Sequence, residues 1–86
     1  MSTIKMYSSN LCGYCRAAHR LLSKKGVDNY ETIIVDGDYA LRAHMIQISG
    51  RHTVPQIFIG ERHIGGYTDL AALDAAGELD ELLKEF

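Results

Sequence analysis

Several features that mark specialised classes of protein are scarce in this sequence. It has two cysteines, one proline and no tryptophan among its 86 residues. Two cysteines are too few for the disulfide framework of a small secreted domain, which usually has about four or more. No apolar run approaches the roughly 20 residues of a transmembrane helix, and residues 1–8 lack the charged-then-apolar pattern of a signal peptide. We therefore expect a cytoplasmic protein.

Charge of one sign is scarce as well, since the formal net charge is −2 at pH 7. Such a balance gives no electrostatic reason to expect a nucleic acid or an anionic membrane as a partner. The composition is otherwise that of a globular protein, with 47% hydrophobic and 23% charged residues. A chain of this length fits one domain, and no linker or repeat divides it. Residues 1–86 are therefore expected to form a single domain.

The hydrophobic pattern predicts strands that alternate with helices. Glycines are placed as helix stops, Asp36-Gly37-Asp38 supplies a turn with an N-cap, and Thr68 is expected to cap the third helix. An apolar stripe that includes Tyr14 is expected on the first helix. The predicted strands are 3–7, 30–35, 56–59 and 62–64. The first predicted helix begins within 10–13 and ends near 25, and the second begins after 38 and ends near 50. The third runs from 68 to about 76, and the last from 79 to about 86.

This order predicts the fold class. A strand–helix–strand unit implies a parallel pair with a right-handed crossover, and the hairpin adds an antiparallel pair. Helices would then flank a mixed four-stranded sheet in the order βαβαββα, followed by a C-terminal helix. That is the architecture of a thioredoxin-like α/β fold, and a Cys-x-x-Cys motif near a βαβ pattern is a cue for it.

The stretch Cys12-Gly13-Tyr14-Cys15 lies where the first strand gives way to the first helix. A cysteine at a helix N-terminus is exposed to unpaired N–H groups and about half a positive charge, which favour the thiolate. Such cysteines can have pKa values of roughly 3.5–7.5. Residues three apart on a helix face the same way, so Cys15 can close a disulfide with Cys12. We therefore expect Cys12 to be the catalytic nucleophile and Cys15 the resolving thiol.

Two plainer interpretations compete with this one. In the first, the pair consists of buried cysteines that act as small hydrophobes, because a Cys-x-x-Cys motif is a moderate signal by itself. Zinc is the other, with His19 one turn beyond Cys15. Cys12 and His19 would lie roughly 10.5 Å apart along a helix axis, too far to share one tetrahedral ion with ligands at about 2.0–2.3 Å. No metal site is therefore predicted.

Four segments together resemble the glutaredoxins over essentially the whole chain, with the order and spacing of the short bacterial members. They are Cys12-Gly13-Tyr14-Cys15, Ser49-Gly50 before Thr53-Val54-Pro55, Gln56-Ile57-Phe58-Ile59, and Gly65-Gly66-Tyr67-Thr68-Asp69. The resemblance assigns the nucleophile to Cys12 and the resolving role to Cys15.

The resemblance also implies a glutathione site. Tyr14 matches the ring that flanks glutathione, and Thr53-Val54-Pro55 matches a loop with a cis proline. The backbone of Val54 would then pair with the glutathione cysteine as a small strand does. Gly66 and Tyr67 belong to the same site. Thr68 and Asp69 would hold the γ-glutamyl end, with N–H groups for its carboxylate and Asp69 for its amine. Arg42 matches a position that reaches the glycine carboxylate in many members.

Two departures from the family pattern bear on this site. Many members have a lysine three residues before the first cysteine, where this chain has Ser9. One contact to the glycine carboxylate of glutathione is therefore missing. Many dithiol members also have a proline between the cysteines, where this chain has Gly13, which relaxes the backbone there.

The resemblance therefore implies a glutathione-dependent thiol–disulfide oxidoreductase that supports redox homeostasis in the cell. Its partners would be glutathione, as co-substrate, and disulfide-containing or glutathionylated proteins, and a monomer is expected. An alternative is a carrier of a 2Fe–2S cluster, held between two copies by Cys12 of each and two glutathiones. A second alternative is a redoxin reduced by a flavoenzyme, against which the glutathione-binding pattern argues.

Overall fold

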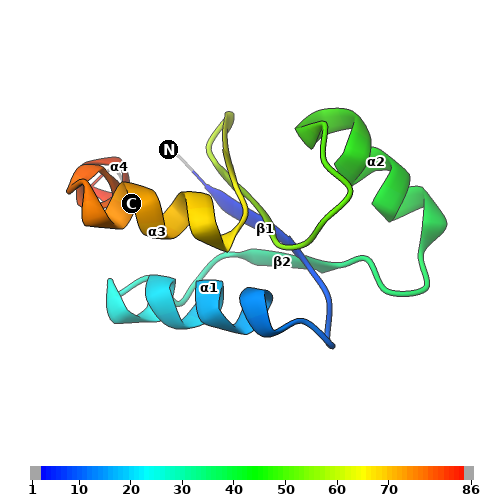
Figure 1. Cartoon of the computed structure of the whole chain (residues 1–86), viewed down its shortest axis with the longest axis horizontal. Coiled ribbons are helices and arrows are strands. Elements are labelled where there is room, and N and C mark those ends of the chain that lie inside the picture. Colours follow the sequence, from blue (N-terminus) through cyan, green and yellow to red (C-terminus); the bar gives the residue numbers. More distant parts are fainter. Residues whose placement is uncertain (1–2, 85–86) are drawn as a thin grey trace.

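The computed structural model describes residues 3–84. The element order is β1–α1–β2–α2–β3–β4–α3–α4, as the sequence predicts (Figure 1). The expected end of the last helix at Phe86 lies outside the described residues. The strands are β1 (Ile4–Ser8), β2 (Glu31–Ile34), β3 (Gln56–Ile59) and β4 (Arg62–Gly65), and the helices are α1 (Gly13–Lys24), α2 (Tyr39–Ser49), α3 (Tyr67–Ala75) and α4 (Glu78–Leu83).

The strands form one mixed sheet in the order β2-β1-β3-β4. β1 is parallel to β2 and antiparallel to β3, and β3 is antiparallel to β4. The register places Tyr7 opposite Gln56 and Ile57 opposite Gly65. The end of β1, the start of β3 and the end of β4 therefore lie at one edge of the sheet, and the segments that carry the sequence motifs leave the sheet there. The predicted thioredoxin-like fold is confirmed.

The two faces of the sheet carry two apolar clusters, because side chains alternate along each strand. On one face, Ile4, Met6 and Ile57 pack with residues of α1, α3 and α4. On the other face, Tyr7 packs with Met45 of α2. Figure 1 shows the same division, with α1 and α3 apart from α2. The start of α1 and the start of α3 are thereby held on the same face of the sheet.

Local sequence explains where α2 begins and ends. The Asp38 carboxylate accepts a hydrogen bond from the Leu41 backbone N–H at 3.0 Å, so Asp38 is the expected N-cap. Gly50 ends the helix in the left-handed conformation with φ 72°. This turn directs the following residues back to the start of β3.

Two local predictions are wrong. Thr68 does not cap α3, because the helix already begins at Tyr67 and Gly66 is the N-cap residue. Asp69 closes this turn by accepting a hydrogen bond from the Gly66 N–H at 2.9 Å. Tyr14 is not part of the buried stripe of α1, since its side chain is 66% exposed. It lies in the first turn of α1, a helix of which only Cys15, Ala18 and Leu22 are buried.

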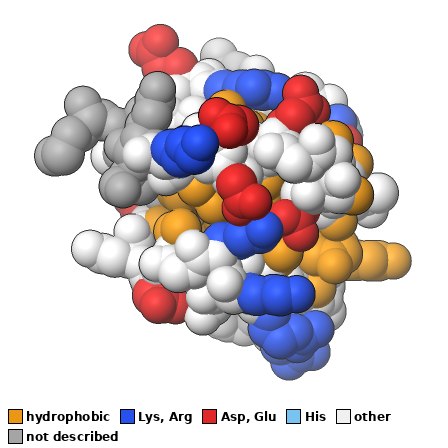
Figure 2. Space-filling model, turned by 90° about the vertical axis from the view of Figure 1, so that its left-hand side faces the viewer, with side chains coloured by type: hydrophobic (Ala, Val, Ile, Leu, Met, Phe, Trp, Pro, Cys, Tyr) orange, Lys and Arg blue, Asp and Glu red, His pale blue; other side chains and the backbone are white. Residues whose placement is uncertain are grey.

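The end of the molecule at the left of Figure 1 shows interspersed acidic and basic side chains (Figure 2). Lys25, at the C-terminal end of α1, contacts the carboxylates of Asp74 at 2.6 Å and Asp80 at 3.0 Å. These contacts connect α1 to α3 and to α4.

Within residues 3–84, no helix is long and apolar enough to cross a membrane.

Candidate active site

Cys12 is the N-cap residue of α1, with its sulfur at the positive end of the helix. The Cys15 backbone N–H donates a hydrogen bond to Cys12 Sγ at 3.2 Å. The Cys12 backbone is extended, with φ −128° and ψ 113°, as is usual for an N-cap. The side chain is partly exposed and is a free thiol. The Cys12 sulfur is therefore in direct contact with an N–H group of the first turn of α1.

Cys15 is buried, with 1% of its surface exposed. Burial raises the pKa of the Cys15 thiol, and the neighbouring Cys12 adds to the rise. Hydrogen bonds from Ser8 and Ser9 act in the opposite direction. Cys15 is therefore held as a neutral thiol next to the more accessible Cys12 sulfur. This difference is typical of a pair in which one cysteine is the nucleophile and the other the resolving thiol.

The loop before β3 lies against Cys12. The Val54–Pro55 peptide bond is cis, which confirms the expectation based on the resemblance. Cys12 Sγ lies 3.6 Å from the Val54 carbonyl oxygen, to which the thiol donates. A residue from a loop 42 positions later in the chain is thus in contact with the candidate nucleophile.

A groove of about 400 Å³ begins beside this contact. Tyr14 and Tyr67 line it with stacked rings, 6.3 Å between centroids. The structure brings together every predicted glutathione-contact residue except Arg42, and adds Arg51. The lining residues are Tyr14, Arg51, Thr53, Val54, Pro55, Gly66, Tyr67, Thr68 and Asp69.

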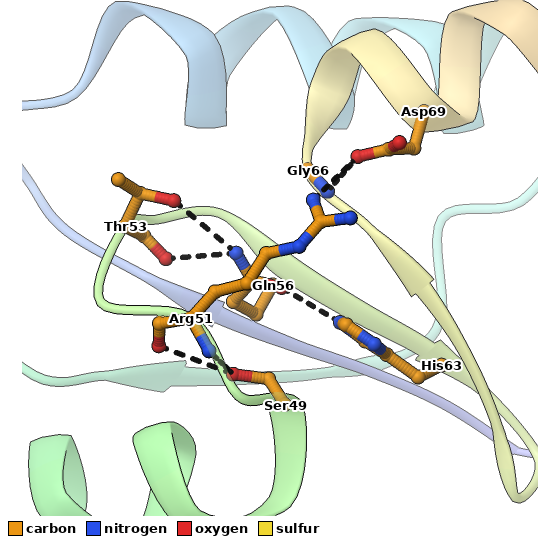
Figure 3. Close-up of polar contacts among 7 residues, drawn as sticks. All are labelled: Ser49, Arg51, Thr53, Gln56, His63, Gly66 and Asp69. Atoms are coloured by element: carbon orange, nitrogen blue, oxygen red, sulfur yellow. Dashed lines mark hydrogen bonds and ion pairs between the residues drawn. The ribbon is translucent and has the colours of Figure 1, made fainter.

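Gln56, the first residue of β3, holds the preceding loop at Thr53 through hydrogen bonds. It is fully buried, and its amide Nε2 donates to the Thr53 carbonyl at 3.0 Å and lies 3.4 Å from Thr53 Oγ1. Its Oε1 lies 2.7 Å from His63 Nε2, so the imidazole donates to it (Figure 3). Because the Thr53 carbonyl can only accept, it requires the amide NH2 to face it, and the Oε1 end in turn requires the proton of His63 to be on Nε2.

Asp69 lines the groove from the first turn of α3. Its Oδ2 accepts hydrogen bonds from Arg51 Nη1 at 2.7 Å and from the Gly66 N–H at 2.9 Å (Figure 3). The Arg51 guanidinium, followed by the Gly66 N–H, lowers the pKa of this carboxyl. Asp69 therefore presents a negative charge to the groove at neutral pH.

Arg42 lies outside the residues that line the groove. Its Nη1 donates to the His52 carbonyl at 3.3 Å, and its positive charge contributes to the lowered pKa of the Asp36 carboxyl. Its predicted contact with the glycine carboxylate stays a prediction.

Ser9, at the position of the usual lysine, is tied to the loop that follows β2. Its hydroxyl donates to Asp36 Oδ1 at 2.6 Å and accepts from the Leu11 N–H at 3.2 Å. Asp36 Oδ2 also accepts from the Asn10 N–H at 2.9 Å. The Ser9 hydroxyl, followed by the Asn10 N–H, lowers the pKa of the Asp36 carboxyl. Asp36 therefore fixes the segment that leads into Cys12.

Sequence reasoning missed Arg51 and Asp36. Arg51 follows the Ser49-Gly50 pair that the resemblance singled out, so its position in the sequence was a usable signal. The direction of its side chain could not be read from the sequence. Asp36 was assigned only to a turn. Parallel neighbours bring the ends of β1 and β2 together, and that rule was a signal for its contact with residues 9–11.

Comparisons with known proteins agree with this geometry. A sequence model of the family described as Glutaredoxin matches residues 4–64. Glutaredoxin 3 of Escherichia coli is 52% identical over 84 residues, covering 98% of this chain and 100% of the relative. A glutaredoxin of Neisseria meningitidis is 49% identical over 84 residues, covering 98% and 99%.

Solved structures are similar as well. A buckwheat glutaredoxin–glutathione complex has a TM-score of 0.88 at 33% identity and covers 98% of this chain and 78% of that one. The solution structure of glutaredoxin from Brucella melitensis has a TM-score of 0.83 at 45% identity, covering 95% of this chain and 88% of that one.

Proposed function

The chain belongs to the glutaredoxin family, and we propose that it is a glutathione-dependent thiol–disulfide oxidoreductase that reduces glutathione mixed disulfides and protein disulfides. One observation carries the proposal. The partly exposed Cys12 sulfur accepts the Cys15 N–H at the start of α1 and lies 3.6 Å from the cis-proline loop that lines the groove. A nucleophile and a binding site for its thiol substrate are thus adjacent.

The reaction begins when the Cys12 thiolate attacks the glutathione sulfur of a mixed disulfide. A Cys12–glutathione disulfide forms, the old disulfide breaks, and the protein leaves as a thiolate that takes up a proton. A second glutathione thiolate then attacks the glutathione sulfur on Cys12. Oxidised glutathione is released, and the Cys12 thiolate is regenerated.

With a protein disulfide as substrate, Cys15 resolves the intermediate. Cys12 first forms a disulfide with one protein sulfur, and the other protein sulfur leaves. Cys15 then gives up its proton and attacks Cys12 Sγ, which forms the Cys12–Cys15 disulfide and releases the reduced protein. Two glutathiones reduce that disulfide and leave as oxidised glutathione. Because the free Cys12 sulfur contributes to the raised pKa of Cys15, its conversion to a disulfide eases the deprotonation of Cys15.

The groove supports a defined orientation of glutathione. The Val54 backbone lies beside Cys12, where it pairs with the cysteine of glutathione as an added strand does. Thr68 and the Asp69 carboxylate, which line the same groove, hold the γ-glutamyl group. Glutathione is bound in the buckwheat glutaredoxin complex, which shares this fold. We further propose that the chain works as a monomeric single domain in the cytoplasm, where glutathione keeps thiols reduced.

A coupled assay with a glutathionylated peptide, glutathione, glutathione reductase and NADPH tests the proposal. Wild-type protein is expected to sustain NADPH oxidation. Cys12→Ser is expected to abolish it, whereas Cys15→Ser retains much of it because a second glutathione replaces Cys15 in resolution. Wild-type protein that is inactive here but active with a thioredoxin-reducing flavoenzyme would contradict the proposal. Equal loss in both variants would instead mean an obligatory dithiol cycle.

A further inference from the structure

We infer that Arg51 is a specificity-determining residue for the γ-glutamyl end of glutathione, where it forms with Asp69 a paired site for an α-amino acid zwitterion. The inference rests on the proposed function, because it assigns a role within the same groove. Arg51 lines that groove and contacts Asp69 Oδ2 at 2.7 Å.

The backbone at Arg51 is held in place by the end of α2. The Ser49 hydroxyl accepts a hydrogen bond from the Arg51 N–H at 3.1 Å and lies 3.2 Å from the Arg51 carbonyl oxygen. Its proton is donated to the Met45 carbonyl at 2.6 Å. Gly50, at φ 72°, reverses the chain just before this point. The Arg51 side chain is therefore directed across the groove toward the start of α3, as Figure 3 shows.

Space for the ion pair is provided by a glycine. A Cβ at Gly65 would lie 2.4 Å from Asp69 Oδ2 and 3.0 Å from Arg51 Nη1, and the φ of 116° there also favours glycine. The end of β4 thus has a conformation and a lack of side chain that leave room for this pair.

The Arg51–Asp69 pair retains hydrogen-bond donors and an acceptor that the contact between them does not use. Both contacts to Asp69 are made through Oδ2, and within residues 3–84 no other side chain bonds to Oδ1. Arg51 contacts Asp69 through Nη1, which leaves other donors of its planar fork. An ammonium group can bind at Oδ1 while a carboxylate binds to the remaining guanidinium donors. The γ-glutamyl end of glutathione carries an ammonium and a carboxylate on one carbon, so it matches this arrangement.

Exposure keeps the pair available to a ligand. The side chains of Arg51 and Asp69 are 47% and 40% exposed. An exposed ion pair is worth little for stability, so its removal is expected to act on substrate choice more than on folding. The contribution to binding is also expected to shrink as salt is added.

The test compares two mixed disulfides of one peptide, with glutathione and with cysteinylglycine, which lacks the γ-glutamyl group. For Arg51→Gln, kcat/KM with the glutathione disulfide is expected to fall about 3- to 10-fold, mainly through KM. Turnover of the cysteinylglycine disulfide is expected to stay the same. Arg51→Lys is expected to restore part of the loss, because it returns the charge without the fork.

Arg62→Gln is the matched control, since Arg62 is an exposed arginine on β4 outside the groove. It is expected to resemble wild type on both substrates. An equal loss on both substrates in Arg51→Gln, or no loss on either, would overturn the inference. Wild-type protein that shows no preference for the glutathione disulfide would overturn the proposed glutathione site itself, which is a distinct result.

Discussion

Replacement of Gln56 by methionine is expected to destabilise the protein and to loosen the loop beside Cys12. Methionine is similar in length and fits an apolar site, so Gln56→Met removes the hydrogen bonds while keeping most of the packing. The loss covers a 3.0 Å bond to the Thr53 carbonyl and a 2.7 Å bond with His63. A third contact, to Thr53 Oγ1, is weak at 3.4 Å.

The magnitude follows from these contacts. Each of the two good hydrogen bonds contributes roughly 0.5–1.5 kcal/mol net, so the free energy of unfolding is expected to fall by about 1–3 kcal/mol. A small domain has about 5–15 kcal/mol in total, so the variant should still fold. A loss of about 1 kcal/mol lowers Tm by roughly 4–8 °C in a domain of this size, which gives an expected decrease of about 4–24 °C.

Thermal unfolding followed by circular dichroism measures the first effect, and steady-state kinetics with a glutathionylated peptide measures the second. KM is expected to rise more than kcat falls, because Thr53 and Val54 line the groove while Cys12 keeps its hydrogen bond from Cys15. Gln47→Met is the matched control, since Gln47 is exposed on α2. A Gln56→Met variant with unchanged Tm and KM would refute the role given to this amide.

The other predictions concern residues around the nucleophile. Iodoacetamide is expected to modify Cys12 rapidly at neutral pH and Cys15 only at alkaline pH, because the raised pKa keeps the buried Cys15 protonated; equal rates in Cys12→Ser and Cys15→Ser would contradict this. Ser9→Lys is expected to lower KM for a glutathionylated peptide at low salt if the added charge reaches glutathione. It is expected to leave KM unchanged if the lysine binds Asp36 instead, and Ser9→Lys combined with Asp36→Asn separates the two cases. Gly13→Pro is expected to fold, because Gly13 is the first residue of α1 and no atom lies within 4 Å of a Cβ built there. The 2Fe–2S alternative stays a prediction: anaerobic reconstitution with iron, sulfide and glutathione is expected to give a coloured dimer in wild type and none in Gly13→Pro, and a colourless wild-type monomer would count against it.

The sequence predicts the order of strands and helices along the chain well, because the strands and the hairpin follow local patterns. The end of α2 at Gly50 is an example, since a glycine at φ 72° is a local requirement. The start of α3 shows where local reasoning stops. Thr68 has the side chain of a cap, but Asp69 reaches back to the Gly66 N–H and begins the helix earlier. The capping contact is therefore made by the N3 residue Asp69 and not by Thr68.

The candidate site divides in a similar way. Cys12 and Cys15 can be found from spacing and helix position alone. The cis bond before Pro55 and the contacts of the groove could be anticipated only from the resemblance, because nothing local distinguishes them. Arg51 was missed because its importance depends on the direction of a long side chain across the groove toward Asp69, which is set by tertiary structure.

The strand order has a consequence for how this protein can be modified. The segments around Cys12, Val54 and Gly66 all leave the sheet at one edge, whereas the turn at Gly60–Glu61 and the loop 25–30 lie at the other. A fluorophore, an affinity tag or a fused partner inserted at Gly60–Glu61 would sit the length of a strand away from the thiols. Attachment at this turn would therefore leave the surface around the thiols uncovered.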